Sequence, residues 1–325
     1  PIFEPTFSEY SYGFRPNRRC QNAIDRALEL LNQGYEWIID LDLEKFFDKV
    51  PQDKLIRLVD NMVNDSDVTA LIHKYLRAGV LINGEFEDTT IGTPQGGNLS
   101  PLLSNIYLNE LDKELERRGL HFARYADDCV IFVKTEYSAE RVMKNIITFI
   151  ENKLKLKVNA EKTHITRPNN LKYLGFSFWK DKGEWKSKPH KESFKKLFLK
   201  LKKLVKRSWS VDLDYRIKKI NEVLRGWINY YRQSSMKSAL ERIIGPWVRN
   251  AIRVVIWKQW KTSSKQISSL VKLGINEEEA KGLTFCRRGY QFKSHSSVIK
   301  RAISNSRLKK KGLLDPLEYY LKPIA

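Results

Sequence analysis

The sequence predicts an α+β fold over about its first 188 residues and an all-α fold over the remainder. Up to that point, short apolar runs typical of strands alternate with helical stripes, and beyond it the apolar spacing is helical throughout. The charge changes at the same place, because residues 1–180 hold 24 Lys and Arg against 26 Asp and Glu, whereas residues 181–325 hold 35 against 12. We interpret this as a near-neutral catalytic body joined to a basic module that binds a polyanion, in preference to a uniformly basic surface.

The first predicted strand covers residues 36–43. Every second side chain from Trp37 onward is apolar, so one face of the strand packs on a core. Asp40 and Asp42 lie on the other face, which therefore presents carboxylates.

The elements that follow make a mixed layout of strands and helices, which predicts a sheet backed by helices. In order, they are a helix that begins at Pro51, a hairpin that turns over 82–85, a helix with a Ser100 cap and Pro101 in its first turn that ends at Gly119, a strand–turn–strand over 122–133, a helix over 138–154, a strand over 173–178 and a hairpin turn over 181–183. From about His190, long amphipathic helices cover residues 194–209, 217–227 and 246–256.

Composition excludes several classes of protein. The cysteines Cys20, Cys129 and Cys286 are scattered, which disfavours a disulfide framework or a zinc knuckle and favours a reducing, cytoplasmic setting. No apolar run approaches 18 residues, so we expect no membrane span. The chain begins at Pro1 and not at Met, which is typical of a fragment. The sequence makes no prediction about the oligomeric state.

Two adjacent acids, Asp127 and Asp128, occupy the tip of the strand–turn–strand. Tight hairpins prefer Gly or Asn, and adjacent carboxylates repel each other unless a cation lies between them. Together with Asp42 they could ligate divalent metal, and phosphoryl transfer often uses two ions roughly 3.5–4 Å apart. An ordinary acidic turn is the alternative, and the pair of acids alone does not decide between the two.

Six blocks, in order along the chain, resemble the reverse transcriptases encoded by bacterial group II introns, which are also splicing maturases. The blocks are SYGFRP (11–16), DLEKFFD (42–48), GTPQGGNLSP (92–101), YADD (125–128), NAEKT (159–163) and YLGF (173–176). GWINYYR (226–232) is similar to the thumb of that family, called domain X.

The resemblance implies a domain organisation. We expect a reverse-transcriptase palm over 1–188, with an antiparallel-rich sheet, a basic all-α thumb or maturase domain X over 189–262, and a basic helical region over 263–325 that binds nucleic acid. In the family, the block and extension that build most of the fingers precede residues equivalent to Pro1, and the sequence does not contain them.

The resemblance also implies the activity. We expect an RNA-directed DNA polymerase that uses two Mg²⁺ ions and deoxynucleotides to extend a DNA primer on an RNA template, and that also promotes splicing of its intron RNA. An RNA-binding maturase without polymerase activity remains the alternative.

Site residues follow from the same blocks. The implied catalytic residues are Asp42, Asp127 and Asp128, and the implied metal ligands are Asp42, Leu43 and Asp127. The implied nucleotide-binding residues are Phe47, Gln95, Lys162 and Arg15, and the implied primer and template contacts are Gly96, Gly97, Leu174, Gly175, Lys196, Lys200, Lys203 and Arg207.

Several of these residues have a structural alternative. Phe47 would exclude ribonucleotides by contact with the sugar, or it would be a core residue beside Phe46. Arg15 would contact a phosphate, or it would pair with an acid of the palm. Lys162 and the basic helix could be solvated surface, and Leu174 and Gly175 could belong to a buried strand.

Overall fold

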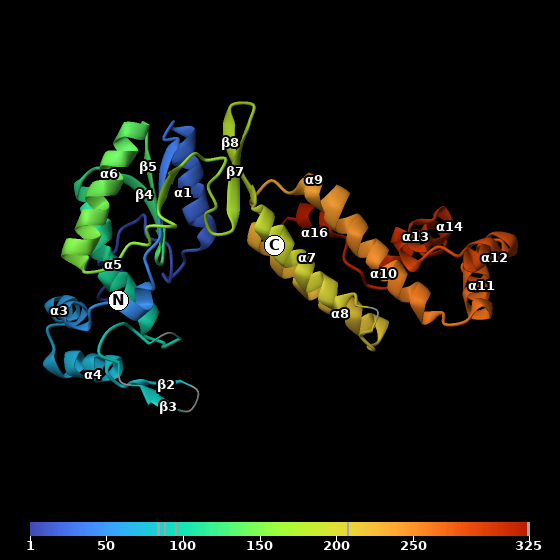
Figure 1. Cartoon of the computed structure of the whole chain (residues 1–325), viewed down its shortest axis with the longest axis horizontal. Coiled ribbons are helices and arrows are strands. Elements are labelled where there is room, and N and C mark those ends of the chain that lie inside the picture. The colour runs from blue at the N-terminus through green and yellow to red at the C-terminus, as the bar shows by residue number, and fades with distance from the viewer. Residues whose placement is uncertain (83–84, 88, 95, 207, 324–325) are drawn as a thin grey trace. The chain divides into compact units, whose positions relative to one another are not determined.

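The computed structural model describes residues 1–82, 85–87, 89–94, 96–206 and 208–323. The chain divides into two compact units, Pro1–Ser187 and Lys188–Ala325. Figure 1 shows strands and helices together in the first unit and helices in the second.

The centre of the N-terminal unit is a four-stranded antiparallel sheet of order β4-β5-β1-β6 (Figure 1). The predicted antiparallel-rich sheet is therefore confirmed. Its strands are β1 (Trp37–Leu41), β4 (His121–Tyr125), β5 (Asp128–Val133) and β6 (His164–Thr166). Asp40 of β1 pairs with Val130 on one side and His164 on the other, so β1 carries its acidic end into the middle of the sheet.

Helices cover both faces of this sheet. Ile39 and Leu41 of β1 share a core with α5 (Ser100–Arg117) and α6 (Glu136–Phe149), which continues as a π-helical turn, Ile150–Leu154. Figure 1 shows α1 (Cys20–Asn32) on the other side of the strands from α6. Ile38 is also fully buried, so the second face of β1 carries acids only from Asp40 onward.

The unit contains further, smaller elements. They are a 3₁₀ turn (Glu4–Thr6), α2 (Phe46–Lys49), α3 (Gln52–Val63), α4 (Ser66–Leu76), β2 (Val80–Ile82) and β3 (Glu85–Glu87). Figure 1 shows α3, α4, β2 and β3 together beyond one end of the sheet. The sequence interpretation missed α4, which begins where the Asp65 side chain accepts hydrogen bonds from the backbone N–H groups of Asp67 and Val68. Asn83 and Gly84, the predicted turn between β2 and β3, lie outside the described residues.

The predicted Ser100 cap of α5 is wrong by one residue. Leu99 is the N-cap, and Ser100 is the first helical residue with Pro101 behind it. The Ser100 hydroxyl donates to the Pro94 carbonyl at 2.6 Å instead of capping the helix. The expected end is confirmed, because Gly119 has a φ of 65° directly after the last turn.

The last hairpin of the unit joins β7 (Phe176–Asp181) to β8 (Glu184–Pro189) through the predicted turn. The expected strand over 173–178 begins only at Phe176. Leu174 (φ 49°) and Gly175 (φ 82°) form a two-residue turn, closed by backbone bonds of 3.1 and 2.8 Å between Tyr173 and Phe176.

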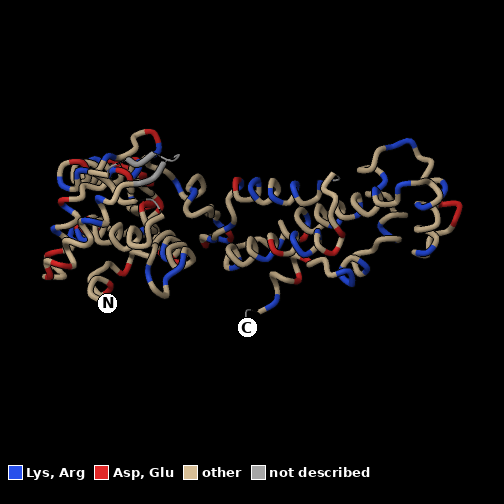
Figure 2. The backbone as a smooth tube through the Cα atoms, turned by 90° about the horizontal axis from the view of Figure 1, so that it is seen from below, with Lys and Arg blue, Asp and Glu red and all other residues tan. Residues whose placement is uncertain are grey.

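The described part of the C-terminal unit is helical after β8, as predicted. Its helices are α7 (Lys191–Leu204), α8 (Leu213–Tyr231), α9 (Lys237–Ala239) with a π-helical turn (Leu240–Ile244), α10 (Gly245–Gln259), α11 (Ser263–Lys272), α12 (Glu277–Phe285), α13 (Tyr290–His295), α14 (Ser297–Ala302), α15 (Asn305–Lys310) and α16 (Pro316–Leu321). Leu197 and Leu201 of α7 are buried. Figure 2 shows Lys and Arg spread along the helices of this unit. No described helix has the length and apolar character needed to cross a membrane.

Candidate active site

Asp42 follows β1 directly, and the block 159–163 fixes its backbone. The Asp42 carbonyl accepts a bond from the Asn159 N–H at 2.9 Å, and its N–H donates to the Thr163 hydroxyl oxygen at 3.1 Å. Two residues that lie 117 and 121 positions from Asp42 in the chain therefore fix its backbone, and the Asp42 side chain is held at the end of the central strand.

Asp127 and Asp128 lie in the tight turn between β4 and β5, where Tyr125 pairs with Asp128. Ala126 holds a left-handed φ of 56°. Gly13 packs against this turn so closely that a Cβ there would lie 2.2 Å from the Ala126 nitrogen. The block that contains Gly13 thus supports the acidic turn, and only glycine leaves the room for it.

A buried arginine ties this turn to the rest of the unit. Arg124 and Asp112 are both fully buried and paired, with Arg124 Nε donating to Asp112 Oδ1 at 2.7 Å. Arg124 also donates to the Ala126 carbonyl at 2.9 Å, to the Ser11 hydroxyl at 2.8 Å and to Asn105 Oδ1 at 3.2 Å. The guanidinium therefore links α5, the block at 11–16 and the acidic turn.

The sequence interpretation did not select Arg124 or Asp112. A signal was present, because an arginine inside the apolar strand segment Phe122-Ala123-Arg124-Tyr125 must find an acid when it is buried. The sequence did not show which acid that would be.

One cavity of about 420 Å³ brings together several predicted residues. Asp42, Asp128 and Lys162 line it, and so do Leu174 and Gly175 of the two-residue turn. Lys162 Nζ lies 3.5 Å from Asp42 Oδ2. Asp127, on the same turn as Asp128, is half-buried and is not among the lining residues.

Carboxylates crowd this cavity. Burial, with the neighbouring Asp42 adding to it and His164 opposing it, raises the pKa of Asp40 to about 6. Burial and the carboxylates of Asp127, Asp40 and Asp42 raise the pKa of Asp128 to about 6. The Asp128 side chain also keeps contact with solvent. Asp40 is an acid of the site that the sequence interpretation placed on the correct face but did not select.

Mg²⁺ prefers oxygen ligands such as carboxylates. A bound Mg²⁺ would also offset the repulsion between neighbouring carboxylates. Asp42 and Asp128 supply carboxylates in this cavity. Leu43 has its side chain in the core, so only its backbone carbonyl could serve as a ligand. Among the described residues, no three His, Cys, Asp or Glu side chains stand close enough together to hold a metal ion without rearrangement.

Phe46 and Phe47 differ in burial, although both pack on the core. Phe46 is buried in the core, Phe47 is half-buried, and their rings meet edge to face at 5.3 Å. The Phe47 carbonyl accepts a bond from the Thr93 N–H at 2.6 Å, which ties the glycine-rich loop to the Phe47 helix.

In the glycine-rich loop, Gly96 has a φ of 82° and nothing near its missing side chain. A Cβ on Gly97 would lie 1.9 Å from the Tyr75 hydroxyl, so Gly97 packs against α4. Gln95 lies outside the described residues.

Arg15 adopts the structural alternative. It is buried, its Nε donates to Glu4 at 2.8 Å, and Nη1 donates to the backbone carbonyls of Ser8 and Ser11. Contact with a nucleotide phosphate would require these bonds to break.

Lys196, Lys200 and Lys203 are exposed on α7, whose Leu197 and Leu201 are buried. They belong to the C-terminal unit, and Arg207 lies outside the described residues.

Known families match both units. The family described as reverse transcriptase (RNA-dependent DNA polymerase) matches residues 1–178, and the family described as group II intron, maturase-specific domain, matches residues 194–273.

Individual relatives agree with these matches. The group II intron-encoded protein LtrA of Lactococcus lactis subsp. cremoris is 27% identical in an alignment of 398 positions that covers 90% of this chain and 66% of LtrA. Protein YkfC of Escherichia coli (strain K12) is 34% identical in an alignment of 216 positions that covers 55% of this chain and 56% of YkfC. The chain thus spans less than two thirds of the length of either relative. Apo telomerase from Candida tropicalis aligns with 98% of this chain and 59% of its own, at 13% identity and a TM-score of 0.49.

Proposed function

The chain belongs to the reverse transcriptase family and carries a group II intron maturase-specific domain, and from this premise we propose that it is an RNA-directed DNA polymerase that also acts as a splicing maturase for its intron RNA. The observation that carries the proposal is the cavity in which Asp42, Asp128 and Lys162 meet the turn at Leu174 and Gly175. This one cavity is lined by acids that would hold metal, by a cation that would contact a triphosphate, and by a turn that would support a primer end.

In this proposal, the 3′-hydroxyl of a DNA primer attacks the α-phosphate of a deoxynucleotide opposite an RNA template, and pyrophosphate leaves. Two Mg²⁺ ions would be held by Asp42, Asp127 and the Leu43 carbonyl, with Asp128 assisting. When bound, Mg²⁺ lowers the pKa of the attacking hydroxyl and neutralises charge on the phosphates.

The side chains of this protein then orient the reactants. Lys162, beside Asp42, would contact the triphosphate and could donate a proton to the departing pyrophosphate. Phe47 would press on the sugar and exclude a 2′-hydroxyl, and Gln95, Gly96 and Gly97 would contact the template and the nucleotide. Leu174 and Gly175 would support the primer terminus.

RNA binding falls to the basic helices. We assign residues 189–262 to the thumb, or domain X, and residues 263–325 to a further nucleic-acid-binding region, after a palm over 1–188. Lys196, Lys200 and Lys203 would contact phosphates of an RNA or RNA–DNA duplex, which helices read by backbone and shape. Affinity should therefore fall steeply with salt.

A maturase that binds RNA without polymerising is the second candidate. One observation favours it, namely the match of residues 194–273 to the maturase-specific domain, which accounts for RNA binding and splicing without any chemistry in the cavity.

Primer extension on polyriboadenylate, with an oligo(dT) primer, dTTP and Mg²⁺, tests the proposal. We expect extension by the chain and a loss of roughly a thousandfold or more in Asp127→Asn, since the metal supplies several kcal/mol of transition-state stabilisation. RNA affinity should stay unchanged in that variant. Asp181→Asn, which removes an acid from the β7–β8 hairpin, is the matched control and should extend normally. Tight, salt-sensitive RNA binding without extension would establish the second candidate instead.

A further inference from the structure

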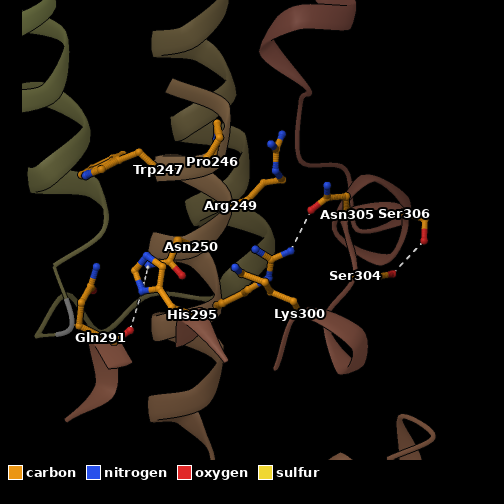
Figure 3. Close-up of a pocket in the computed structure, with 11 residues that line it drawn as sticks. Pro246, Trp247, Arg249, Asn250, Gln291, His295, Lys300, Ser304, Asn305 and Ser306 are labelled. Atoms are coloured by element: carbon orange, nitrogen blue, oxygen red, sulfur yellow. Dashed lines mark hydrogen bonds between the residues drawn. The ribbon is translucent and has the colours of Figure 1, made fainter. Parts of the chain in front are cut away.

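Two neighbouring cavities of the C-terminal unit adjoin α10. The first, of about 640 Å³, is drawn in Figure 3, and the second has about 680 Å³. Trp247, Asn250 and Gln291 line both of them, so the two cavities adjoin each other. We call the two cavities together the α10 groove.

The α10 groove carries positive charge without acids. Among the described residues that line it, none is Asp or Glu. Arg249 is neutralised by Asp315 at 3.0 Å. The remaining basic lining residues are Lys206, Arg253, Lys258, His295 and Lys300.

Arg253 is the deepest of these cations. Only 5% of its surface is exposed, and among the described residues no carboxylate pairs with it. Its Nε donates to the Ile303 carbonyl at 2.9 Å and its Nη2 to Asn305 Oδ1 at 2.8 Å (Figure 3 shows the bond at Asn305). A guanidinium has five N–H groups, so its capacity for a bidentate anion is not used up. A buried charge without a counter-charge is costly, and an anion in the groove would relieve that cost.

Asn250 and Trp247 add features that a bare anion would not need. Asn250 is 7% exposed, and its Oδ1 has no hydrogen-bond partner among the described residues, which leaves an acceptor for a hydroxyl or an amino group. Trp247 packs edge to face on Phe198 at 5.2 Å, and its half-buried ring borders both cavities. Aromatic rings next to cations are the elements that bind bases and phosphates of unpaired strands.

We propose that the α10 groove binds a single-stranded segment of polynucleotide, with phosphates at Arg253, Lys258 and Lys300 and a base against Trp247. The inference rests on the proposed function in so far as it takes a polynucleotide as the ligand. It adds a second binding site, formed entirely by residues of the C-terminal unit and separate from the contacts assigned to α7. RNA and DNA share the phosphodiester, whereas a hydroxyl at Asn250 would come only from RNA.

Binding of fluorescein-labelled 15-nucleotide strands to the full chain tests the inference. Anisotropy titrations over a range of salt concentrations would use an oligouridylate, an oligothymidylate and a 15-base-pair RNA duplex. In Lys258→Glu/Lys300→Glu we expect affinity for the single strands to fall by about tenfold or more. The slope of log affinity against log salt should also become shallower, by about 0.7 for each phosphate that the variant no longer binds. Because both lysines are exposed, these substitutions disturb no core.

The matched control is Lys144→Glu/Lys153→Glu, which makes the same change in net charge at exposed lysines of the N-terminal unit that neither line the groove nor lie in the regions assigned to nucleic-acid binding. It should keep the wild-type slope. Equal losses of affinity in the two double variants would overturn the inference, and so would duplex affinity that falls as much as single-strand affinity. Tighter binding of the RNA strand than of the DNA strand would indicate a contact with the 2′-hydroxyl. Equal binding of RNA and DNA would indicate that the groove recognises the phosphodiester alone. Primer extension measured in parallel separates the two proposals. If the wild-type chain extends the primer but Lys258→Glu/Lys300→Glu binds single strands as the wild type does, only the proposal for the α10 groove is refuted.

Discussion

Both units bury arginines, and the surroundings of Arg124 in the first unit and Arg253 in the second differ. Arg124, in the N-terminal unit, has the carboxylate of Asp112 and donates to Ala126, Ser11 and Asn105 as well. Arg253, in the C-terminal unit, has a carbonyl and an amide oxygen as partners and, among the described residues, no acid. A guanidinium whose donors are all used fixes the backbone around it, whereas one with donors to spare can take up a ligand.

The same difference holds for the units as wholes. Residues 188–325 hold 33 Lys and Arg against 10 Asp and Glu, whereas residues 1–187 hold 26 against 28. Internal pairing of charge builds a rigid site in the first unit. In the second, the excess positive charge must be balanced by ions or by phosphates, which is the physical basis of its proposed role in nucleic-acid binding.

Replacing each arginine by methionine is the strongest test of this difference. Arg124→Met leaves the Asp112 carboxylate buried without a counter-charge, so we expect the free energy of unfolding to fall by about 3–5 kcal/mol. Arg253→Met leaves only two neutral acceptors without a donor, so the loss should be about 1–3 kcal/mol. Urea unfolding followed by circular dichroism measures both. A larger loss for Arg253→Met would contradict the assignment of the two roles.

The control for Arg124 is the double variant Arg124→Met/Asp112→Leu. It removes the stranded charge, so it should be more stable than Arg124→Met alone, although it lacks one more native group. If the double variant is less stable than the single one, Asp112 contributes through its other contacts and not through the ion pair.

Gly13 in the N-terminal unit and Gly226 in the C-terminal unit also differ in their surroundings, and their replacement should change stability less than replacement of Arg124. In Gly13→Ala the new methyl would meet the Ala126 backbone, so stability should fall by about 1–3 kcal/mol. Because the acidic turn must move, primer extension should fall by about a hundredfold. Gly226 lies inside α8 with nothing within 4 Å of an added Cβ, so Gly226→Ala should instead raise stability by about 0.5–1 kcal/mol. Wild-type extension by Gly13→Ala would refute the idea that this glycine sets the position of the acids.

The smallest expected effect is on pH dependence. In the N-terminal unit the pKa values of Asp40 and Asp128 are raised to about 6, so between pH 4 and 6 the folded state binds more protons than the unfolded state. Its free energy of unfolding therefore falls as pH rises through this window and is level above it. In the C-terminal unit, hydrogen bonds to lysines lower the pKa values of Glu222 and Glu277. Their contribution to the free energy of unfolding therefore rises with pH, which is the opposite of the effect of Asp40 and Asp128.

Asp40→Asn removes one of the two raised groups. We expect a shallower fall in stability between pH 4 and 6, and at pH 7 a gain of about 1 kcal/mol, reduced from the full shift because the side chain is only half-buried. Thermal unfolding at pH 4, 5, 6 and 7 gives the slope. An unchanged slope would mean that Asp40 does not titrate in this range.

Local sequence patterns predicted much of the architecture. Alternation predicted β1, helical spacing predicted α5, α6 and α7, and Gly119 marked the end of α5, because each depends on neighbours within one or two turns of the chain. The local patterns gave wrong predictions where contacts outside the segment determined the conformation of the chain. Ser100 bonds to Pro94 and not to its own helix, and the backbone reverses at Leu174 and Gly175 inside an apolar run that looked like a strand.

For the candidate site, the sequence was sufficient to establish the family and the residue types, and their roles stay predictions. Which of these residues share a space depended on the folded chain: Asp42, Asp128 and Lys162 line one cavity, while Arg15 pairs with Glu4. The same holds for Arg124 and Arg253. The side-chain partners of Arg124 are 12, 19 and 113 residues away in the chain, and the partners of Arg253 are 50 and 52 residues away. Side-chain pairing at such separations follows from packing in three dimensions, which no local pattern encodes.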